Sequence, residues 1–160
     1  LAKLFSQGKI DEIKLDLKKH KIGWGLDEKL NIENLEGILA KIGVYKDKVD
    51  VWGDGMVYRE LMCSDDLADA CVYLMQNKEY KDIGELVNIT NGDDILLNDL
   101  FLIIREVVGF EGEIRYDKNK PNGTYRKLMD ATKIKNLGWI PQISLRQGIV
   151  NFYKWYLNNE

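Results

Sequence analysis

The sequence has one histidine, His20, and two cysteines, Cys63 and Cys71, among 160 residues. With so few imidazole and thiol groups, no metal-ligand cluster follows from residue spacing, and no serine–histidine–aspartate arrangement indicates a hydrolase. Two cysteines do not make a disulfide framework, which favours a reducing cytoplasm. We therefore expect no metal site and no catalytic residue in this chain.

Long apolar runs and a strong charge of one sign are also missing. No run approaches the roughly 20 residues of a membrane-spanning helix, and no signal-peptide pattern opens the chain. The formal net charge is −3, so the overall balance gives no sign of nucleic-acid binding. We expect neither a membrane nor a nucleic acid as a partner.

Length and periodicity predict an α+β fold in which helices predominate and strands are short. A chain of this length suits one domain with a proper core. The first residue is Leu1, not methionine, so we expect a further segment upstream. Residues 1–48 have helical spacing and nearly balanced charges, which predicts a loosely packed helical insert or linker. Residues 49–160 are predicted to form the main domain.

The stretch VWGDGMVYRE, residues 51–60, predicts a strand, a tight turn and an extended return. Gly53 and Gly55 allow the reversal, which places Trp52 and Arg59 on either side of it. An aromatic plate beside a guanidinium suits an anionic group attached to a ring. Two alternatives stay open here: Trp52 is a core aromatic at a strand end, and Arg59 forms an ion pair with a nearby carboxylate, from Glu60 or Asp65.

The two glycines do not form a dinucleotide-binding loop. A third glycine is missing, and the segment does not open a helix directly. We therefore expect no cofactor-binding residue in this chain.

Other local signals predict the elements that follow. Ser64 is expected to cap a helix whose first turn carries Asp65 and Asp66, which suit the helix dipole. Residues 87–90 predict a short strand, and residues 97–108 an apolar helix buried on more than one side and ended by Gly109. Ser144 is expected to cap the last helix. Trp139 and Trp155 are expected in the core.

Residues 111–136 are more basic than the rest of the chain. They contain seven Lys or Arg and four Asp or Glu, a net charge of +3. A stretch of this sign, if it faces Arg59, suits a diphosphate held by charge-assisted hydrogen bonds. The alternative is an ordinary solvated surface rich in lysine.

The sequence VWGDGMVYRELMCSDDLADACVYLM resembles the substrate-domain signature of the GDP-L-fucose synthases, which are extended short-chain dehydrogenase/reductases. The resemblance continues through VNITNGDDILLNDLF and the loop KPNGTYRKLMD. It covers about residues 49–158. The helical segment before residue 49 is similar to an insertion in some bacterial members.

The resemblance implies an NADP-dependent epimerase/reductase acting on GDP-4-keto-6-deoxymannose. NADP and the catalytic residues would belong to an N-terminal Rossmann half, which this chain lacks. This chain would be the C-terminal substrate-binding part, inactive alone, from a full-length protein that tends to be a cytoplasmic homodimer. The family's substrate contacts match four positions: Trp52, Arg59, Asn122 and Arg126.

Departures from the family pattern leave the substrate open. Asn122 stands where the family usually has Asp in a Pro-Asp-Gly loop, and Tyr125 replaces Pro. Asn hydrogen-bonds but supplies no charge. A related GDP-sugar, a deoxyhexose or heptose derivative, is therefore an alternative. Two further alternatives are an epimerase or dehydratase for another nucleotide-sugar and a binding module without catalysis.

Overall fold

Three N-terminal helices pack around a small core of their own. The computed structural model describes residues 1–20 and 34–158. The helices are α1 (Ala2–Ser6), α2 (Ile10–Lys19) and α3 (Leu35–Lys41). Their core consists of five buried side chains, which are Phe5, Ile13, Leu17, Leu35 and Leu39. The expectation of a loosely packed insert was wrong, because buried apolar side chains from all three helices pack into one core.

Two strands far apart in the sequence form the first sheet. β1 (Lys48–Trp52) pairs in parallel with β4 (Glu113–Asp117), and Lys48 is opposite Glu113. The pairing extends one step beyond β1, since the N–H of Gly53 donates to the carbonyl of Asp117 at 3.0 Å. No local sequence signal specifies this parallel pairing, because the two strands are far apart in the sequence.

The second sheet joins β2 (Tyr58–Arg59) to β3 (Ile95–Leu96) in antiparallel register. The strand expected at residues 87–90 is not present; these residues form no regular secondary structure, and Thr90 is almost fully buried. Their β-branched side chains are buried or half-buried, but their backbone takes part in no strand pairing. The short pairing instead forms after the Gly92 turn, at residues 95–96.

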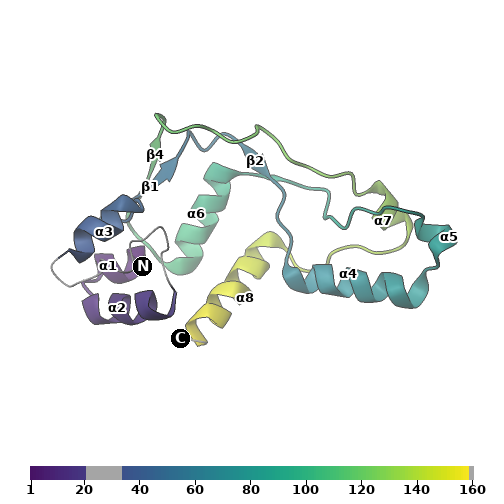
Figure 1. Cartoon of the computed structure of the whole chain (residues 1–160), viewed down its shortest axis with the longest axis horizontal. Helices are drawn as coiled ribbons and strands as arrows, with labels where there is room; N and C mark the ends of the chain where they lie inside the picture. The colour runs from purple at the N-terminus through teal and green to yellow at the C-terminus, as the bar shows by residue number, and fades with distance from the viewer. Residues whose placement is uncertain (21–33, 159–160) are drawn as a thin grey trace.

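A second core lies between α4 (Ser64–Asn77) and α7 (Thr132–Asn136), with the short helix α5 (Tyr80–Ile83) beside them (Figure 1). Its buried members are Ala70, Leu74, Ala131, Ile134 and Trp139. The core position of Trp139 is confirmed. The N-cap of α4 is Cys63, not Ser64, because Ser64 already lies in the first turn.

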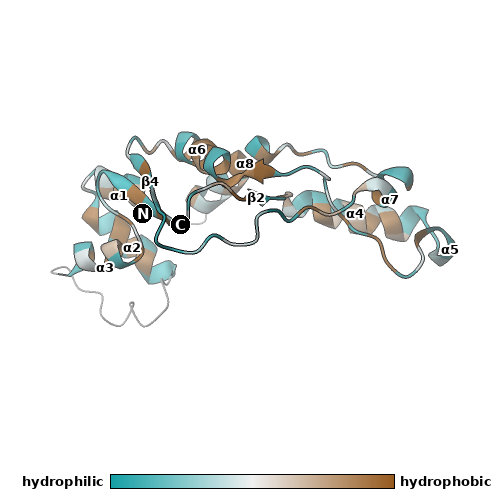
Figure 2. Cartoon of the chain, turned by 90° about the horizontal axis from the view of Figure 1, so that it is seen from above, coloured by the Kyte–Doolittle hydropathy of each residue, from teal (hydrophilic) through white to brown (hydrophobic). Residues whose placement is uncertain are grey.

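Helices α6 (Leu97–Val108) and α8 (Leu145–Asn158) pack together in the middle of the elongated molecule (Figure 1). Gly109 ends α6 in the left-handed conformation, as predicted, and Ser144 Oγ accepts from the N–H of Gln147 at the start of α8. Both helices carry apolar residues, which are brown in Figure 2. An apolar cavity of about 700 Å³ lies against them.

Two expectations for these helices were wrong. α6 is not buried on more than one side: Leu102 and Ile104 are exposed, and Leu100 is its buried residue. Trp155 is 60% exposed and stacks on Phe152. The fold class, α+β with short strands and predominant helices, is confirmed.

Candidate functional site

The turn after β1 owes its shape to two glycines and one aspartate. Gly53 and Gly55 have φ of +85° and +76°, which few other residues tolerate. Asp54 Oδ1 accepts from the N–H of Met56 at 2.9 Å. This bond, and a further side-chain hydrogen bond with Asn122, hold the pKa of Asp54 below its ordinary value. The glycines therefore shape the turn, as predicted.

Residues 118–131, here called the basic segment, run alongside this turn and β2. They contain no helix or strand. The backbone N–H of Tyr58 donates to the carbonyl of Tyr125 at 2.8 Å. Three contacts join the two pieces of chain, and they occur in the same order along each piece. Lys120 contacts Trp52, Asn122 contacts Asp54, and Thr124 contacts Arg59. The side-by-side course follows from the parallel pairing of β1 and β4, which both pieces continue (Figure 1).

Trp52 lies at the surface. Its side chain is 68% exposed, and the Lys120 ammonium lies 5.2 Å from the centre of the ring. The alternative interpretation of Trp52 as a core aromatic was wrong. An exposed indole next to a cation can stack with a planar ring and leave the cation near attached phosphates.

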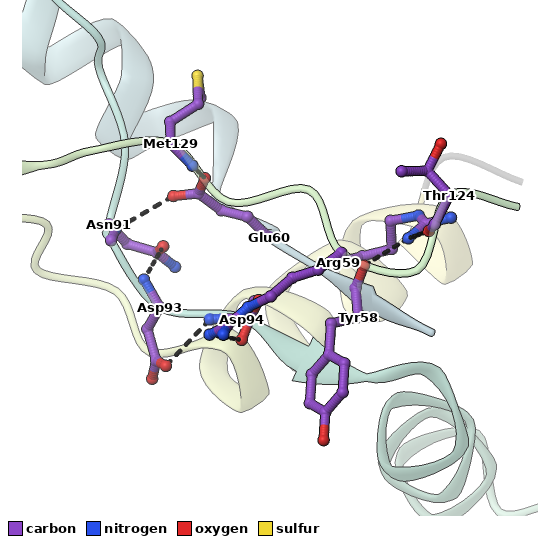
Figure 3. A network of polar contacts seen from close by, with 10 residues as sticks. Tyr58, Arg59, Glu60, Asn91, Asp93, Asp94, Thr124 and Met129 are labelled. Atoms are coloured by element: carbon purple, nitrogen blue, oxygen red, sulfur yellow. Dashed lines mark hydrogen bonds and ion pairs between the residues drawn. The ribbon is translucent and has the colours of Figure 1, made fainter. Parts of the chain in front are cut away.

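Arg59 holds the basic segment through its guanidinium (Figure 3). Its Nη1 donates to the carbonyls of Tyr58 and Thr124, at 2.5 and 2.7 Å. Gly123 makes room for the group, since a Cβ there would lie 2.7 Å from Arg59 Nη2. The alternative of an ion pair with Glu60 or Asp65 is wrong for the part of the chain that the structure describes, because the Arg59 guanidinium binds two carbonyls. Both Glu60 oxygens accept backbone N–H groups instead.

Asn122 is fastened to the turn rather than left free. Its Oδ1 accepts from the N–H of Asp54 at 3.0 Å. A Cβ on Gly53 would come within 2.3 Å of the same oxygen. Gly53 is therefore needed both for its backbone conformation and for the approach of Asn122.

Arg126 forms an ion pair with Asp94, in which Nε and Nη2 lie 2.5 and 3.1 Å from the carboxylate oxygens. The guanidinium also lies 5.7 Å from the centre of the Tyr58 ring. The hydrogen bond to Asp94 raises the pKa of Arg126. The Asp94 side chain is only 5% exposed while that of Arg126 is 56% exposed, so the pair presents the arginine outward.

The positive charge of residues 111–136 is partly balanced by carboxylates from elsewhere. Asp94 pairs with Arg126, and Asp50 pairs with Arg115 through two hydrogen bonds of 2.7 and 2.5 Å. Sequence reasoning missed both, because the partners lie 32 and 65 residues apart. No local sequence signal identifies them.

A cavity of about 540 Å³ opens beside Arg59. Its lining includes Asn91, Asp93, Asp94 and Gln142. Carboxylate and amide groups suit hydroxyl ligands better than phosphates. This side of Arg59 therefore differs in chemistry from the side that carries Trp52 and Lys120.

The remaining chemistry-bearing residues lie elsewhere. His20 Nδ1 forms a hydrogen bond with Asp16 at 2.9 Å at the end of α2, and the His20 ring lies tilted against the Tyr156 ring with 5.1 Å between their centres. Across residues 1–20 and 34–158, no group of three or more His, Cys, Asp or Glu side chains could hold a metal ion. In the same residues no helix is long and apolar enough to cross a membrane.

Comparison with known proteins shows which proteins the chain resembles. Residues 29–90 match the NAD dependent epimerase/dehydratase family. Putative GDP-L-fucose synthase 2 of Arabidopsis thaliana is 48% identical over 113 residues, which are 71% of this chain and 34% of the plant protein. GDP-L-fucose synthase of Escherichia coli (strain K12) is 36% identical over 118 residues, 70% of this chain and 37% of that protein.

Several solved structures match nearly all of the chain. A GDP-6-OMe-4-keto-L-xylo-heptose reductase from Campylobacter jejuni is 36% identical, with a TM-score of 0.85 over 99% of this chain and 45% of the reductase. A GDP-D-glycero-L-gluco-heptose synthase from the same organism, solved in the presence of NADPH, is 37% identical, with a TM-score of 0.81 over 98% of this chain and 44% of the synthase.

The chain is therefore similar to members of the NAD dependent epimerase/dehydratase family, as the resemblance predicted. Within that family it matches the C-terminal part of GDP-L-fucose synthases. It spans about a third of the length of these curated relatives.

Proposed function

We propose that this chain is the substrate-binding domain of an NADP-dependent GDP-sugar epimerase/reductase, and that it binds the GDP end of the sugar nucleotide. The observation that carries the proposal is the alignment of the basic segment with the turn after β1. It brings Trp52, Arg59, Asn122 and Arg126 onto two adjacent pieces of chain. The four positions are those that the family resemblance marks as substrate contacts.

Each residue has a defined task in the proposed complex. Trp52 stacks on a ring of the nucleotide, and Arg59 and Arg126 donate charge-assisted hydrogen bonds to the diphosphate. Asn122 fixes the basic segment to the turn through its side-chain oxygen, and its amide NH₂ donates to the nucleotide. The chain thus binds and orients the substrate, and none of these residues is a catalyst.

Cofactor binding belongs to a different part of the proposed enzyme. NADP or NADPH would supply the hydride for reduction at C4. The described residues do not fit it: the turn at Gly53 and Gly55 leads into β2, not into a helix N-terminus that would receive a pyrophosphate. We therefore place the cofactor in a separate Rossmann half, with residues 1–48 as the insert or linker and residues 49–160 as the substrate domain of a cytoplasmic homodimer.

The first candidate product is GDP-L-fucose or a close GDP-sugar. A second candidate is a GDP-heptose derivative. In structure, the heptose enzymes of Campylobacter jejuni match 98–99% of this chain, including the N-terminal helices. This match supports the heptose alternative.

Isothermal titration calorimetry tests the proposed function with GDP, GDP-mannose and UDP as separate ligands. We expect binding of both guanosine ligands, weaker binding of UDP, and a loss of affinity of about tenfold or more in Arg59→Ala. The matched control is Arg146→Ala, which breaks an exposed ion pair with Glu106 on α6. Equal affinity for GDP and UDP, or an unchanged Arg59→Ala, would contradict the proposal, as would NADPH oxidation by the chain alone.

A further inference from the structure

Glu60 joins two segments that are distant in sequence. It follows Arg59 directly at the end of β2, and its side chain points away toward the Gly92 turn and the basic segment (Figure 3). Its Oε1 accepts from the N–H of Gly92 at 3.1 Å, and its Oε2 accepts from the N–H of Met129 at 3.0 Å. Both carboxylate oxygens are therefore used to hold backbone.

Further contacts hold the Gly92 end of this bridge in place. Thr90, which is 1% exposed, accepts from the N–H of Gly92 through Oγ1 at 3.1 Å. Asn91 Nδ2 donates to the carbonyl of Leu61 at 2.9 Å. A Cβ on Gly92 would lie 2.6 Å from the Cβ of Ala131, so the turn lies directly against the end of the basic segment.

The same turn also positions Arg126. Two residues after Gly92, the largely buried Asp94 forms the ion pair with Arg126. The basic segment has no helix or strand, so side-chain bonds fix much of its course. Arg59 holds Thr124, Asp94 holds Arg126, and Glu60 holds Met129.

We propose that Glu60 is a positioning residue for GDP binding, because its bridge between Gly92 and Met129 keeps Arg126 and Thr124 in register with Arg59. The inference rests on the proposed function, since it assumes that the basic segment contacts GDP. Glu60 itself is not assigned a contact with the ligand. It acts through the segment that it holds.

The chemistry of the bridge requires a carboxylate of this length. Both partners are N–H donors, and an ionised carboxylate accepts through both oxygens. A glutamine would turn an NH₂ group toward one of the two N–H groups and release that segment. An aspartate keeps the charge but is one methylene shorter, so it holds one segment and not both.

The experiment compares Glu60→Gln and Glu60→Asp with wild type, and Glu85→Gln serves as the matched control because Glu85 is exposed and lies on a different segment. GDP affinity is measured by calorimetry, and amide exchange at Gly92 and Met129 by NMR. We expect GDP affinity to fall about tenfold in Glu60→Gln and less in Glu60→Asp. Exchange at Met129 or Gly92 should rise in both variants, and Glu85→Gln should match wild type.

The outcomes separate the two proposals. If wild type binds GDP and Glu60→Gln binds equally well while Met129 exchanges faster, the positioning role is wrong and the proposed function stands. If wild type does not bind GDP, the proposed function fails. If Glu60→Gln does not fold, Glu60→Asp decides: unchanged affinity with faster exchange overturns the role. In the proposed full-length enzyme, Glu60→Asp should raise KM for the GDP-sugar and leave kcat within about twofold.

Discussion

The side-chain oxygen of Asn122 accepts a hydrogen bond from the backbone N–H of Asp54 at 3.0 Å, across 68 residues of sequence. This bond fastens the basic segment to the turn after β1. The residue that the resemblance marked as a substrate contact is therefore also a structural tie. Removal of the Asn122 side chain should therefore alter the turn even when no ligand is bound.

The tie can be tested with Asn122→Ala, for which Asn119→Ala is the control in the same segment. Asn119 uses its backbone N–H, not its side chain, to bond Asp117. We expect faster amide exchange at Asp54 and weaker GDP binding in Asn122→Ala, because the acceptor for that N–H is gone. Asn119→Ala should behave like wild type. Equal exchange at Asp54 in both variants would show that the bond does not hold the turn.

A side chain at position 53 should be costly for two reasons. Gly53 has a positive φ, and an added Cβ would collide with Asn122 Oδ1. Gly8→Ala is the control, since Gly8 has a φ of +69° but nothing within 4 Å of an added Cβ. Both variants carry a backbone cost of about 1 kcal/mol. Urea unfolding should show a larger loss for Gly53→Ala; equal losses would mean that the collision is relieved without cost.

Two adjacent aspartates in α4 should differ sharply in importance. The Asp66 carboxylate is buried and accepts from the N–H groups of Gln142 and Ile143, both at 3.0 Å, whereas Asp65 is exposed. Asp66→Ala leaves two N–H groups without their acceptor, so we expect a loss of about 2–3 kcal/mol in the free energy of unfolding. Asp65→Ala removes only a dipole contribution of about 0.3–1 kcal/mol. Similar losses in the two variants would contradict this account of Asp66.

The ion pair between Asp50 and Arg115 predicts a pH dependence of stability. The hydrogen bond from Arg115 lowers the pKa of Asp50 below the ordinary 3.8. A lowered pKa in the folded state stabilises the fold above the ordinary value, and this contribution is lost as the pH falls through the lowered pKa. Arg115→Gln should therefore lower Tm at pH 7. The gap to wild type should shrink below pH 3.8; a gap that stays constant down to acid unfolding would contradict the assignment.

The sequence predicted those parts of the fold that local residues determine. The turn follows from Gly53 and Gly55, and the end of α6 follows from Gly109, because each glycine takes a backbone conformation that other residues avoid. The exposed placement of Trp52 beside the turn was one of two open interpretations. Periodicity found α6 itself, but not the exposure of its outer apolar side chains.

The parts that failed depend on partners far along the chain. The pairing of β1 with β4 joins residues more than 60 positions apart in the sequence. The hydrogen bond between Glu60 and Met129 spans a similar separation. Glu60 was considered only as a neighbour of Arg59, because nothing local shows that Gly92 and Met129 would meet it. Asp66 was explained by the helix dipole alone for the same reason. Carboxylates that bind backbone N–H groups leave no periodic pattern in a sequence.

The most direct test of the account follows the indole N–H signal of Trp52 by NMR while GDP is titrated into the chain. The four tryptophan indoles are assigned by single substitutions. The account predicts that the Trp52 indole and the backbone amides of residues 122–126 shift together with GDP and shift less with UDP. If GDP at millimolar concentration moves other tryptophans but leaves Trp52 and residues 122–126 in place, the proposed GDP site is wrong.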